Sequence, residues 1–210
     1  AQSAVSEVNQ ILKLAQSKKI PVTTLPSREF RNRFKMHDSQ HIVAEAYPPK
    51  QIQLKTILND SENYPTIVVL DHLEDPYNFG AIARTCEGLG VTTLIYAKNR
   101  QASLTSGVIK ASSGAIYHLN CVEVPNIATA IDQLKQNGYW IYGADSNNGT
   151  PLPMVSKNTP LVVVVGNEHK GISKRVSSFL DCKVKIPMKG AIDSFNVSVA
   201  TGILLYSLLN

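Results

Sequence analysis

The stretch Leu161-Val-Val-Val-Val-Gly166-Asn-Glu-His-Lys-Gly171 decides the fold of this chain. Five apolar residues in a row, four of them β-branched, are typical of a strand that is buried on both faces. At Gly166 the sequence turns polar and the strand ends. Because open α/β sheets bind their ligands at the carboxyl ends of their strands, the loop that follows is the first candidate for a functional site.

A second strand end and a helix start follow within thirty residues of this loop. The segment 183–186 predicts a short strand that ends at Ile186-Pro187, and residues 194–196 precede a long apolar helix over 196–209. We therefore expect two strand ends and one helix start to converge on a single crevice.

Strands and helices alternate through the rest of the chain from residue 66 onward. The predicted strands are 66–70, 93–96, 121–124, 140–144, 161–165 and 183–186, and the predicted helices are 81–89, 106–112, 127–136, 173–179 and 196–209. Such alternation is typical of an α/β fold, with a mostly parallel sheet covered by helices on both faces.

The first 46 residues predict a separate small α/β unit. Its expected order is a helix over 3–18, a strand over 20–25, a helix from Ser27 and a strand over 41–46. Domains of this size rarely bury enough surface to be stable alone. Two prolines in Tyr47-Pro-Pro-Lys50 mark a boundary, so we expect a domain over 1–46, a linker over 47–63 and a second domain over 64–210.

Composition indicates an ordinary globular protein. The 210 residues are 43% hydrophobic and 18% charged, which is enough to bury a full core. Three widely spaced cysteines, Cys86, Cys121 and Cys182, predict neither a disulfide framework nor a zinc site, and a reducing cytoplasm is expected. No apolar run is long enough for a membrane span, and no signal peptide is visible at the start.

A modest positive charge leaves the partner open, but its distribution is informative. The chain has 21 Lys plus Arg against 16 Asp plus Glu, a net charge of +5. Four of these cations, Arg28, Arg31, Arg33 and Lys35, share eight residues with two phenylalanines. Such a segment can bind RNA phosphates and stack on a base, or it can be a solvated helix face with two core aromatics. The segment alone favours neither.

The first cluster with chemical potential lies at residues 70–86, where an acidic, proline-bearing loop follows a predicted strand. Asn78 sits where it could cap the helix that carries Arg84, and capping with a surface ion pair is one interpretation of the two residues. In the other, Asn78 and Arg84 hold a phosphodiester and its neighbouring ribose, because the planar guanidinium suits phosphate.

The second cluster is the loop from Gly166 to Gly171. Its glycines allow close backbone approach to a ligand, and Glu168 could accept hydrogen bonds from backbone or from an amine, or remain a solvated carboxylate. His169 has no partner at metal-ligand spacing and is expected at the surface. The loop lacks both the Gly-x-Gly-x-x-Gly fingerprint and a phosphate-binding loop, so dinucleotide and triphosphate binding are poorly supported.

The third cluster runs from Ile186 to Ala200. Met188 and Phe195 could frame an apolar slot for a purine, with Ser194 and Asn196 pointing back toward Glu168. Taken alone, the Ser-Phe-Asn sequence is equally a helix-capping sequence.

In this order and spacing, the three clusters resemble the motifs of the SpoU family, also called the TrmH family, of RNA ribose 2′-O-methyltransferases in the SPOUT superfamily. The matching residues are Asn-Phe-Gly-x-x-x-Arg-Thr from position 78, Gly-Asn-Glu-x-x-Gly from position 166, Ile-Pro-Met-x-Gly from position 186 and Ser-x-Asn-Val-Ser-Val-Ala from position 194. The resemblance covers about residues 66–207 and includes Lys110-Ala-Ser-Ser-Gly-Ala. The family's usual leucine is replaced by Phe195.

This resemblance implies a carboxyl-terminal trefoil knot that binds S-adenosylmethionine in a bent conformation, and a homodimer. Because methyl transfer from a sulfonium requires no Lewis acid, we expect no metal. It assigns catalysis to Asn78, Arg84, Glu168, Ser194 and Asn196, and cofactor binding to Gly166, Ile186, Met188 and Phe195. Since a guanidinium stays protonated and is a poor base, we expect Arg84 to orient a phosphate and stabilise developing oxyanion charge.

Residues 1–46 resemble the later part of the ribosomal-protein-like RNA-binding domain of the RlmB branch, without its opening strand. This likeness favours a guanosine of 23S ribosomal RNA as the target, with transfer RNA as the alternative. A non-catalytic RNA-binding relative would lose the Asn78, Arg84 and Glu168 set, which this chain retains. An ordinary nucleotide-binding enzyme would need a glycine-rich first turn, which residues 75–80 do not supply.

Overall fold

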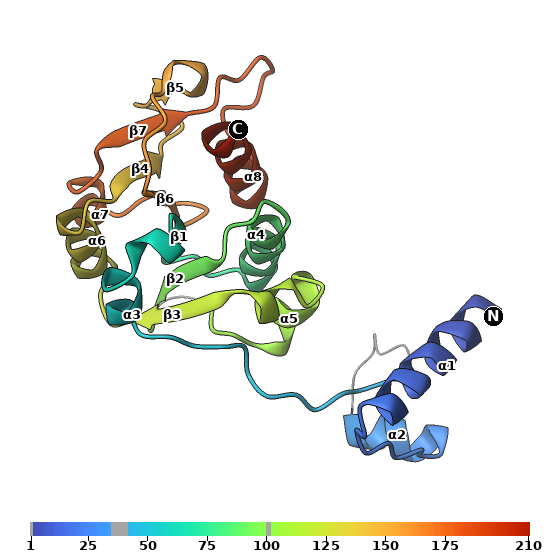
Figure 1. Cartoon of the computed structure of the whole chain (residues 1–210). Coiled ribbons are helices and arrows are strands. Elements are labelled where there is room, and N and C mark those ends of the chain that lie inside the picture. The colour runs from blue at the N-terminus through green and yellow to red at the C-terminus, as the bar shows by residue number, and fades with distance from the viewer. Residues whose placement is uncertain (1, 35–41, 100–101) are drawn as a thin grey trace. The chain divides into compact units, whose positions relative to one another are not determined.

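The structure is a computed structural model that describes residues 2–34, 42–99 and 102–210 (Figure 1). Its contacts divide the chain into two compact units, Ala1–Tyr47 and Pro48–Asn210. No helix in the described part of the chain is both long and apolar enough to cross a membrane.

The second unit is built on a seven-stranded sheet in which every pair of neighbours is parallel. This confirms the predicted α/β fold. The strands are β1 (Thr66–Asp71), β2 (Thr93–Ala97), β3 (Asn120–Val124), β4 (Trp140–Ala144), β5 (Thr150–Pro151), β6 (Leu161–Gly166) and β7 (Cys182–Lys185).

The order of the strands places β1 and β6 side by side at the centre of the sheet. The full order is β3-β2-β1-β6-β4-β7-β5. From β1 the chain continues to β2 on one side, whereas from β6 it continues to β7 on the other. The register sets Asp71, the last residue of β1, beside Gly166, the last residue of β6. A ligand crevice is expected where neighbouring connections diverge in this way.

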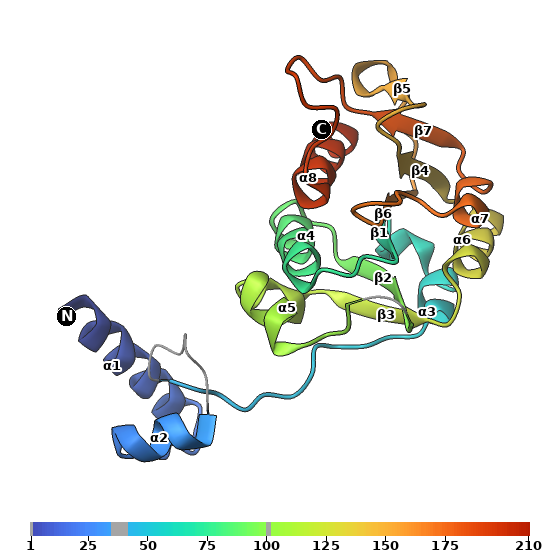
Figure 2. The same cartoon turned by 180° about the vertical axis from the view of Figure 1, so that it is seen from behind.

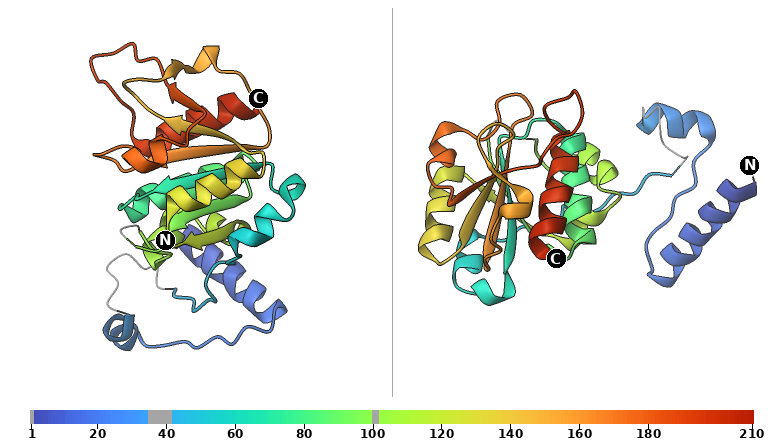
Figure 3. Two further views of the ribbon diagram at one scale, coloured as in Figure 1. Left: turned by 90° about the vertical axis from the view of Figure 1, so that its left-hand side faces the viewer. Right: turned by 90° about the horizontal axis from the view of Figure 1, so that it is seen from above.

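Helices cover both faces of the sheet, as the view from above shows (Figure 3). One face is covered by α4 (Pro76–Gly88), α5 (Ser106–Ala111) and α8 (Val197–Leu209), and the other by α3 (Leu54–Leu58), α6 (Ile127–Gln136) and α7 (Lys174–Ser177). Short 3-10 turns lie at Ser61–Asn63, Ala115–His118 and Leu152–Met154.

The side chains of the central strands pack into the hydrophobic cores on both faces of the sheet, which explains the continuous apolar sequence of these strands. In β1, Val68 and Leu70 pack toward α4 and α8, while Ile67 and Val69 pack toward α3 and α6. All six residues of β1 and of β6 are buried. A strand between two helical layers cannot alternate apolar with polar residues, so the prediction from residues 161–165 is confirmed.

Several element boundaries differ from the prediction. Helix α4 begins at Pro76, since proline suits the first turn of a helix. Its cap is Asp75 and not Asn78, because the Asp75 side chain accepts a hydrogen bond from the Tyr77 N–H at 2.9 Å. The predicted helix 173–179 keeps only the four residues of α7. Helix α3 lies inside the expected linker, and β5 is too short to be seen as a periodic pattern. The trefoil knot stays a prediction.

The first unit contains helices α1 (Gln2–Ser17) and α2 (Ser27–Phe34) and, among its described residues, no strand (Figure 2). The predicted strand over 20–25 was wrong. Ile20 and Val22 are 57% and 51% exposed, and a strand needs a neighbour to pair its backbone groups. In the predicted strand 41–46, residues 42–46 are irregular and His41 lies outside the described residues.

Helices α4 and α5 approach closely because residue 80 is a glycine. A Cβ at Gly80 would lie 2.5 Å from the Cβ of Ala111, 2.7 Å from the carbonyl oxygen of Val108 and 2.8 Å from the amide nitrogen of Ser112. Two of these three atoms belong to the backbone, so a rotamer change cannot relieve the contact. The glycine of the Asn-Phe-Gly motif therefore brings the turn at residues 112–114 against α4.

We predict that Gly80→Ala lowers the free energy of unfolding by about 1–3 kcal/mol, because overpacking outweighs the better helix propensity of alanine. Gly88→Ala is the matched control in the same helix, since nothing lies within 4 Å of its added Cβ. Urea unfolding followed by circular dichroism measures both variants. Equal stabilities of the two variants would contradict the packing argument.

Candidate active site

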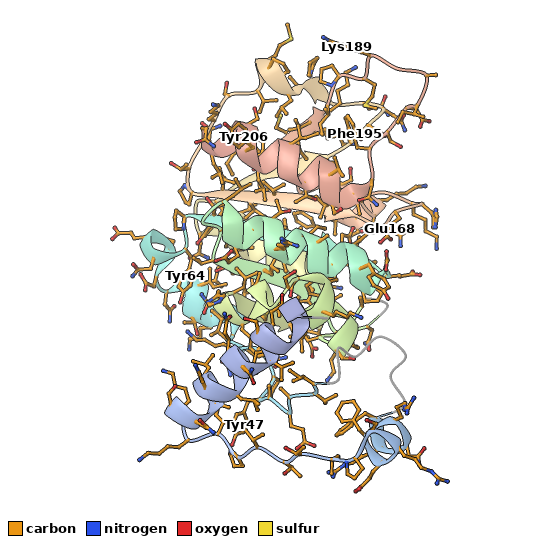
Figure 4. All side chains as sticks on the ribbon, turned by 90° about the vertical axis from the view of Figure 1, so that its right-hand side faces the viewer. Tyr47, Tyr64, Glu168, Lys189, Phe195 and Tyr206 are labelled. Atoms are coloured by element: carbon orange, nitrogen blue, oxygen red, sulfur yellow. The ribbon has the colours of Figure 1, made fainter. Side chains whose placement is uncertain are left out.

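A cavity of about 500 Å³ lies at the carboxyl ends of β4, β6 and β7. This volume is in the range of small-molecule sites, about 300–1,000 Å³. Six residues predicted from the sequence line it: Gly166, Glu168, Ile186, Met188, Ser194 and Phe195. In Figure 4, Glu168 lies on the loop after β6 and Phe195 lies next to the amino end of α8.

Gly166 is required by the shape of the loop that it opens. Asn167 and Gly171 exchange two backbone hydrogen bonds, at 3.1 and 2.9 Å, which fold the loop back on itself. A Cβ at Gly166 would lie 2.2 Å from the carbonyl carbon of Gly171. Any side chain at this position would therefore displace the return strand of the loop.

The three motif loops meet through a chain of side-chain hydrogen bonds. The Asn78 amide on α4 donates from Nδ2 to Oε1 of Glu168 at 3.1 Å. Its Oδ1 accepts from Nδ2 of Asn196 at 3.0 Å. Asn78 therefore does not cap the helix. From the first turn of α4 it links the loop that carries Glu168 to the loop that carries Asn196.

Asn196 also caps α8, so the polar chain is anchored in a helix. Its Oδ1 accepts from the Ser198 N–H at 2.9 Å and from the Ser198 hydroxyl at 2.6 Å. A capping asparagine satisfies helix N–H groups that would otherwise lack partners. The capping interpretation of the Ser-Phe-Asn sequence is confirmed for Asn196, and its amide contacts Asn78 rather than Glu168. Ser194 lines the cavity, but its hydroxyl is 3.4 Å from Asp193 and not bonded to Glu168.

Arg84 is not part of this hydrogen-bonded chain. Its guanidinium is exposed and donates from Nη1 to the hydroxyl of Ser113 at 3.1 Å, in the turn that Gly80 brings against the helix. Arg84 lies six positions after Asn78, which corresponds to about 9 Å along the axis of α4 and about 120° around it. The structure thus places the two residues on different sides of one helix, with Asn78 next to α8 and Arg84 next to α5.

Two residues that organise the site were missed from the sequence. The side chain of Asp71 is fully buried; its Oδ2 accepts from the Ser173 N–H at 2.7 Å, and its Oδ1 lies 2.6 Å from Nδ1 of His72. Asn167 donates to the His72 carbonyl oxygen at 2.9 Å. The available signal was polar residues directly after two continuous apolar strands.

A further carboxylate lines the cavity at the end of β4. The N–H groups of Asn148 and Asn147 both donate to Oδ1 of Asp145 at 3.0 Å, and the ammonium of Lys183 lies 3.2 Å from Oδ2. The Asn148 N–H, the Asn147 N–H and the Lys183 ammonium hold the pKa of Asp145 below its ordinary value, although partial burial opposes them.

The lining residues fit the expected cofactor. Ile172, Leu180, Ile186 and Phe195 supply apolar surface for a purine, and carboxylates, lysines and loop amides supply polar groups. Among the described residues, no three His, Cys, Asp or Glu side chains are grouped as metal ligands.

The predicted RNA-binding cations of the first unit lie on α2. Arg28, Arg31 and Arg33 are exposed, while Phe30 and Phe34 pack together with ring centroids 5.0 Å apart. The Arg33 guanidinium lies 5.4 Å from the centroid of the Phe34 ring. Lys35 lies outside the described residues.

Comparison with known proteins gives one consistent result. The model of the SpoU rRNA Methylase family matches residues 65–206. A Staphylococcus haemolyticus protein described as a TrmH family tRNA/rRNA methyltransferase is 37% identical over 203 residues, 95% of this chain and 81% of that protein.

Solved structures agree with this match. The TrmH/SpoU tRNA modifying enzyme of A. aeolicus is 32% identical with a TM-score of 0.62, over 74% of this chain and 82% of that one. The SpoU methyltransferase AviRb of Streptomyces viridochromogenes, solved in complex with AdoMet, is 27% identical with a TM-score of 0.63, over 68% of this chain and 58% of that one. The chain therefore belongs to the SpoU rRNA methylase family of RNA methyltransferases.

Proposed function

We propose that this protein transfers a methyl group from S-adenosylmethionine to a ribose 2′-hydroxyl in RNA, a guanosine of 23S ribosomal RNA being the preferred target. The observation that carries the proposal is the hydrogen-bonded chain from Glu168 through Asn78 to Asn196 at the cavity. These residues come from three separate motifs, on the loop after β6, on α4 and before α8.

Gly166, Ile186, Met188 and Phe195 would hold the cofactor. AviRb, which shares the family, was solved with AdoMet, and all four residues line the cavity here. S-adenosylmethionine supplies a methyl group activated by a sulfonium. The residues of this chain then have to align the ribose oxygen with that methyl group, and positioning of this kind accounts for much of the rate of a transfer reaction.

The polar chain gives Asn78 a defined orientation for this task. Both ends of its amide are held, by Glu168 on one side and by Asn196 on the other. A side chain restrained at both ends loses little rotamer entropy when it binds the ribose. Glu168 and Asn196 therefore keep Asn78 in place, while Ser194 on the cavity wall orders the loop before α8.

Arg84 provides the cation that an RNA phosphate needs. Its guanidinium is exposed beside Ser113 and lies outside the cavity, so it can reach a phosphate next to the target ribose. A planar guanidinium binds phosphate in two parallel hydrogen bonds. In this position Arg84 orients the RNA backbone and stabilises negative charge that develops on the substrate.

Replacing Arg84 tests this role. Arg84→Ala is expected to lower methyl transfer to RNA at least about a hundredfold, as loss of a preorganised charge does, while the affinity for S-adenosylmethionine changes less than about twofold. Transfer of tritiated methyl to ribosomal RNA and calorimetric titration with the cofactor are the two measurements. Arg175→Ala, which changes an exposed residue of α7 that does not line the cavity, is the control and should behave as the wild type. Joint loss of transfer and cofactor binding would reject the role.

The first unit supports ribosomal RNA as the proposed target. The exposed arginines Arg28, Arg31 and Arg33 on α2, with Lys35, favour binding of an RNA backbone by the first unit. Transfer RNA is the alternative, since a TrmH/SpoU relative is a tRNA modifying enzyme. Ribose methylation mapped on total RNA from cells with and without the gene separates the two.

Cys86, Cys121 and Cys182 are free thiols, which agrees with work in a reducing cytoplasm.

The proposal includes a homodimer, and α8 supports it. This helix is apolar around its whole circumference, a pattern typical of a helix covered on all sides. Yet Val199 and Tyr206 are 49% and 64% exposed, with the half-buried Ile203 between them. These three positions form one stripe at helical spacing, on the part of α8 where Figure 4 shows Tyr206.

We predict that Tyr206→Glu converts the dimer to monomers, because it places a charge in the apolar contact. Light scattering after size exclusion gives the mass of the wild type and of the variant. Tyr47→Glu changes an equally large side chain that is 92% exposed and should leave the mass of the dimer unchanged. A monomeric wild-type protein would overturn this part of the proposal.

A further inference from the structure

Asp145 and Lys183 form an ion pair on the wall of the candidate active site. Asp145 directly follows β4, Lys183 lies on the neighbouring strand β7, and both line the cavity. Lys183 Nζ lies 3.2 Å from Asp145 Oδ2, and the two side chains keep 39% and 22% of their surface exposed. The pair is therefore accessible to a ligand in the cavity.

The backbone holds Asp145 in one orientation. Its own N–H donates to the Val184 carbonyl oxygen at 2.9 Å, which extends the pairing of β4 with β7 by one residue. Its Oδ1 accepts from the N–H groups of Asn147 and Asn148. Because Oδ1 already has two donors, Oδ2 is the oxygen that can exchange Lys183 for a ligand.

The other carboxylates on the cavity wall are less suited to bind a cationic group of a ligand. Glu168 already accepts from Asn78 at 3.1 Å. Asp193 lies in an exposed loop, and its described bond is a long one from Ser194 at 3.4 Å. Within the described residues, Asp145 is the lining carboxylate that is fixed by the backbone and paired with an ammonium.

We infer that Asp145 and Lys183 bind the α-amino-carboxylate end of S-adenosylmethionine, the α-ammonium group on Asp145 and the carboxylate on Lys183. This inference rests on the proposed function and names residues that recognise its cofactor. It involves no covalent step. The nucleoside part of the ligand then lies toward Ile186 and Phe195, where the cavity is apolar.

Charge matching supports this assignment. The ammonium and carboxylate of an amino acid are attached to one carbon, so their separation is comparable to the 3.2 Å between the two protein groups. When the ligand binds, each protein charge exchanges a partner of the opposite sign for another, and no charge is left buried without one. Hydrogen bonds between charged partners are roughly twice as strong as neutral ones.

The test compares two ligands that share the thionucleoside and differ in the amino-acid end. S-adenosylhomocysteine carries this end, whereas 5′-methylthioadenosine has a methyl group in its place. Asp145→Asn should weaken S-adenosylhomocysteine about tenfold or more and change 5′-methylthioadenosine less than about twofold, measured by calorimetry on the full chain. Lys183→Gln should show the same difference between the ligands.

Asparagine is the appropriate replacement at position 145 because it makes the same turn with the N–H groups that follow it. Asp132→Asn, at a half-buried residue of α6 that does not line the cavity, is the control for the chemical change and should leave both affinities unchanged. Thermal unfolding verifies that the variants remain folded, and Asp145→Ser provides a second neutral variant if asparagine disturbs the turn.

Four results would overturn the inference. Equal weakening of both ligands in Asp145→Asn would place the carboxylate at the nucleoside, and unchanged affinity for S-adenosylhomocysteine would remove it from the site. A wild-type protein that binds the two ligands equally well would exclude any subsite for the amino-acid end. A wild type that binds neither ligand would reject the proposed function itself, together with this inference.

Discussion

The in-register parallel pairing of β1 with β6 is the constraint on which the site depends. Because Asp71 lies beside Gly166, the loops that follow the two strands leave the sheet at one point. From there α4 runs along one face and α7 along the other. A shift of one residue in this pairing would turn the buried side chains of a strand to the opposite layer, so the cores on both faces enforce the register.

A buried carboxylate stabilises the place where the two loops separate. Asp71 accepts from the backbone of Ser173 and lies beside His72, whose carbonyl oxygen accepts from Asn167. A buried charge is costly unless its hydrogen bonds are complete, so this arrangement favours one conformation of both loops. The position of Glu168, and through it that of Asn78, follows from this anchor.

The sequence predicted the part of the structure that depends on local pattern. Continuous apolar runs located β1 and β6, and the residues after Gly166 and Ile186 were placed at the cavity. Pairing order is a long-range property, so the position of β6 between β1 and β4 did not follow from the pattern. The strand expected at residues 20–25 failed because apolar alternation cannot provide a neighbouring strand. Asn78 was mistaken for a possible cap because Asp75-Pro76 was not recognised as the start of α4.

Helix α4 carries Asn78 in its first turn and Arg84 six residues later, and it packs between α5 and α8, closely against α5 at Gly80. The helix consequently keeps a constant separation between the side chain of Asn78 and that of Arg84. If Asn78 holds the ribose and Arg84 the phosphate, as proposed, an RNA can bind both only where it presents the two groups at that spacing. Substrate selection would then begin with the shape of the nucleic acid, before any base is recognised.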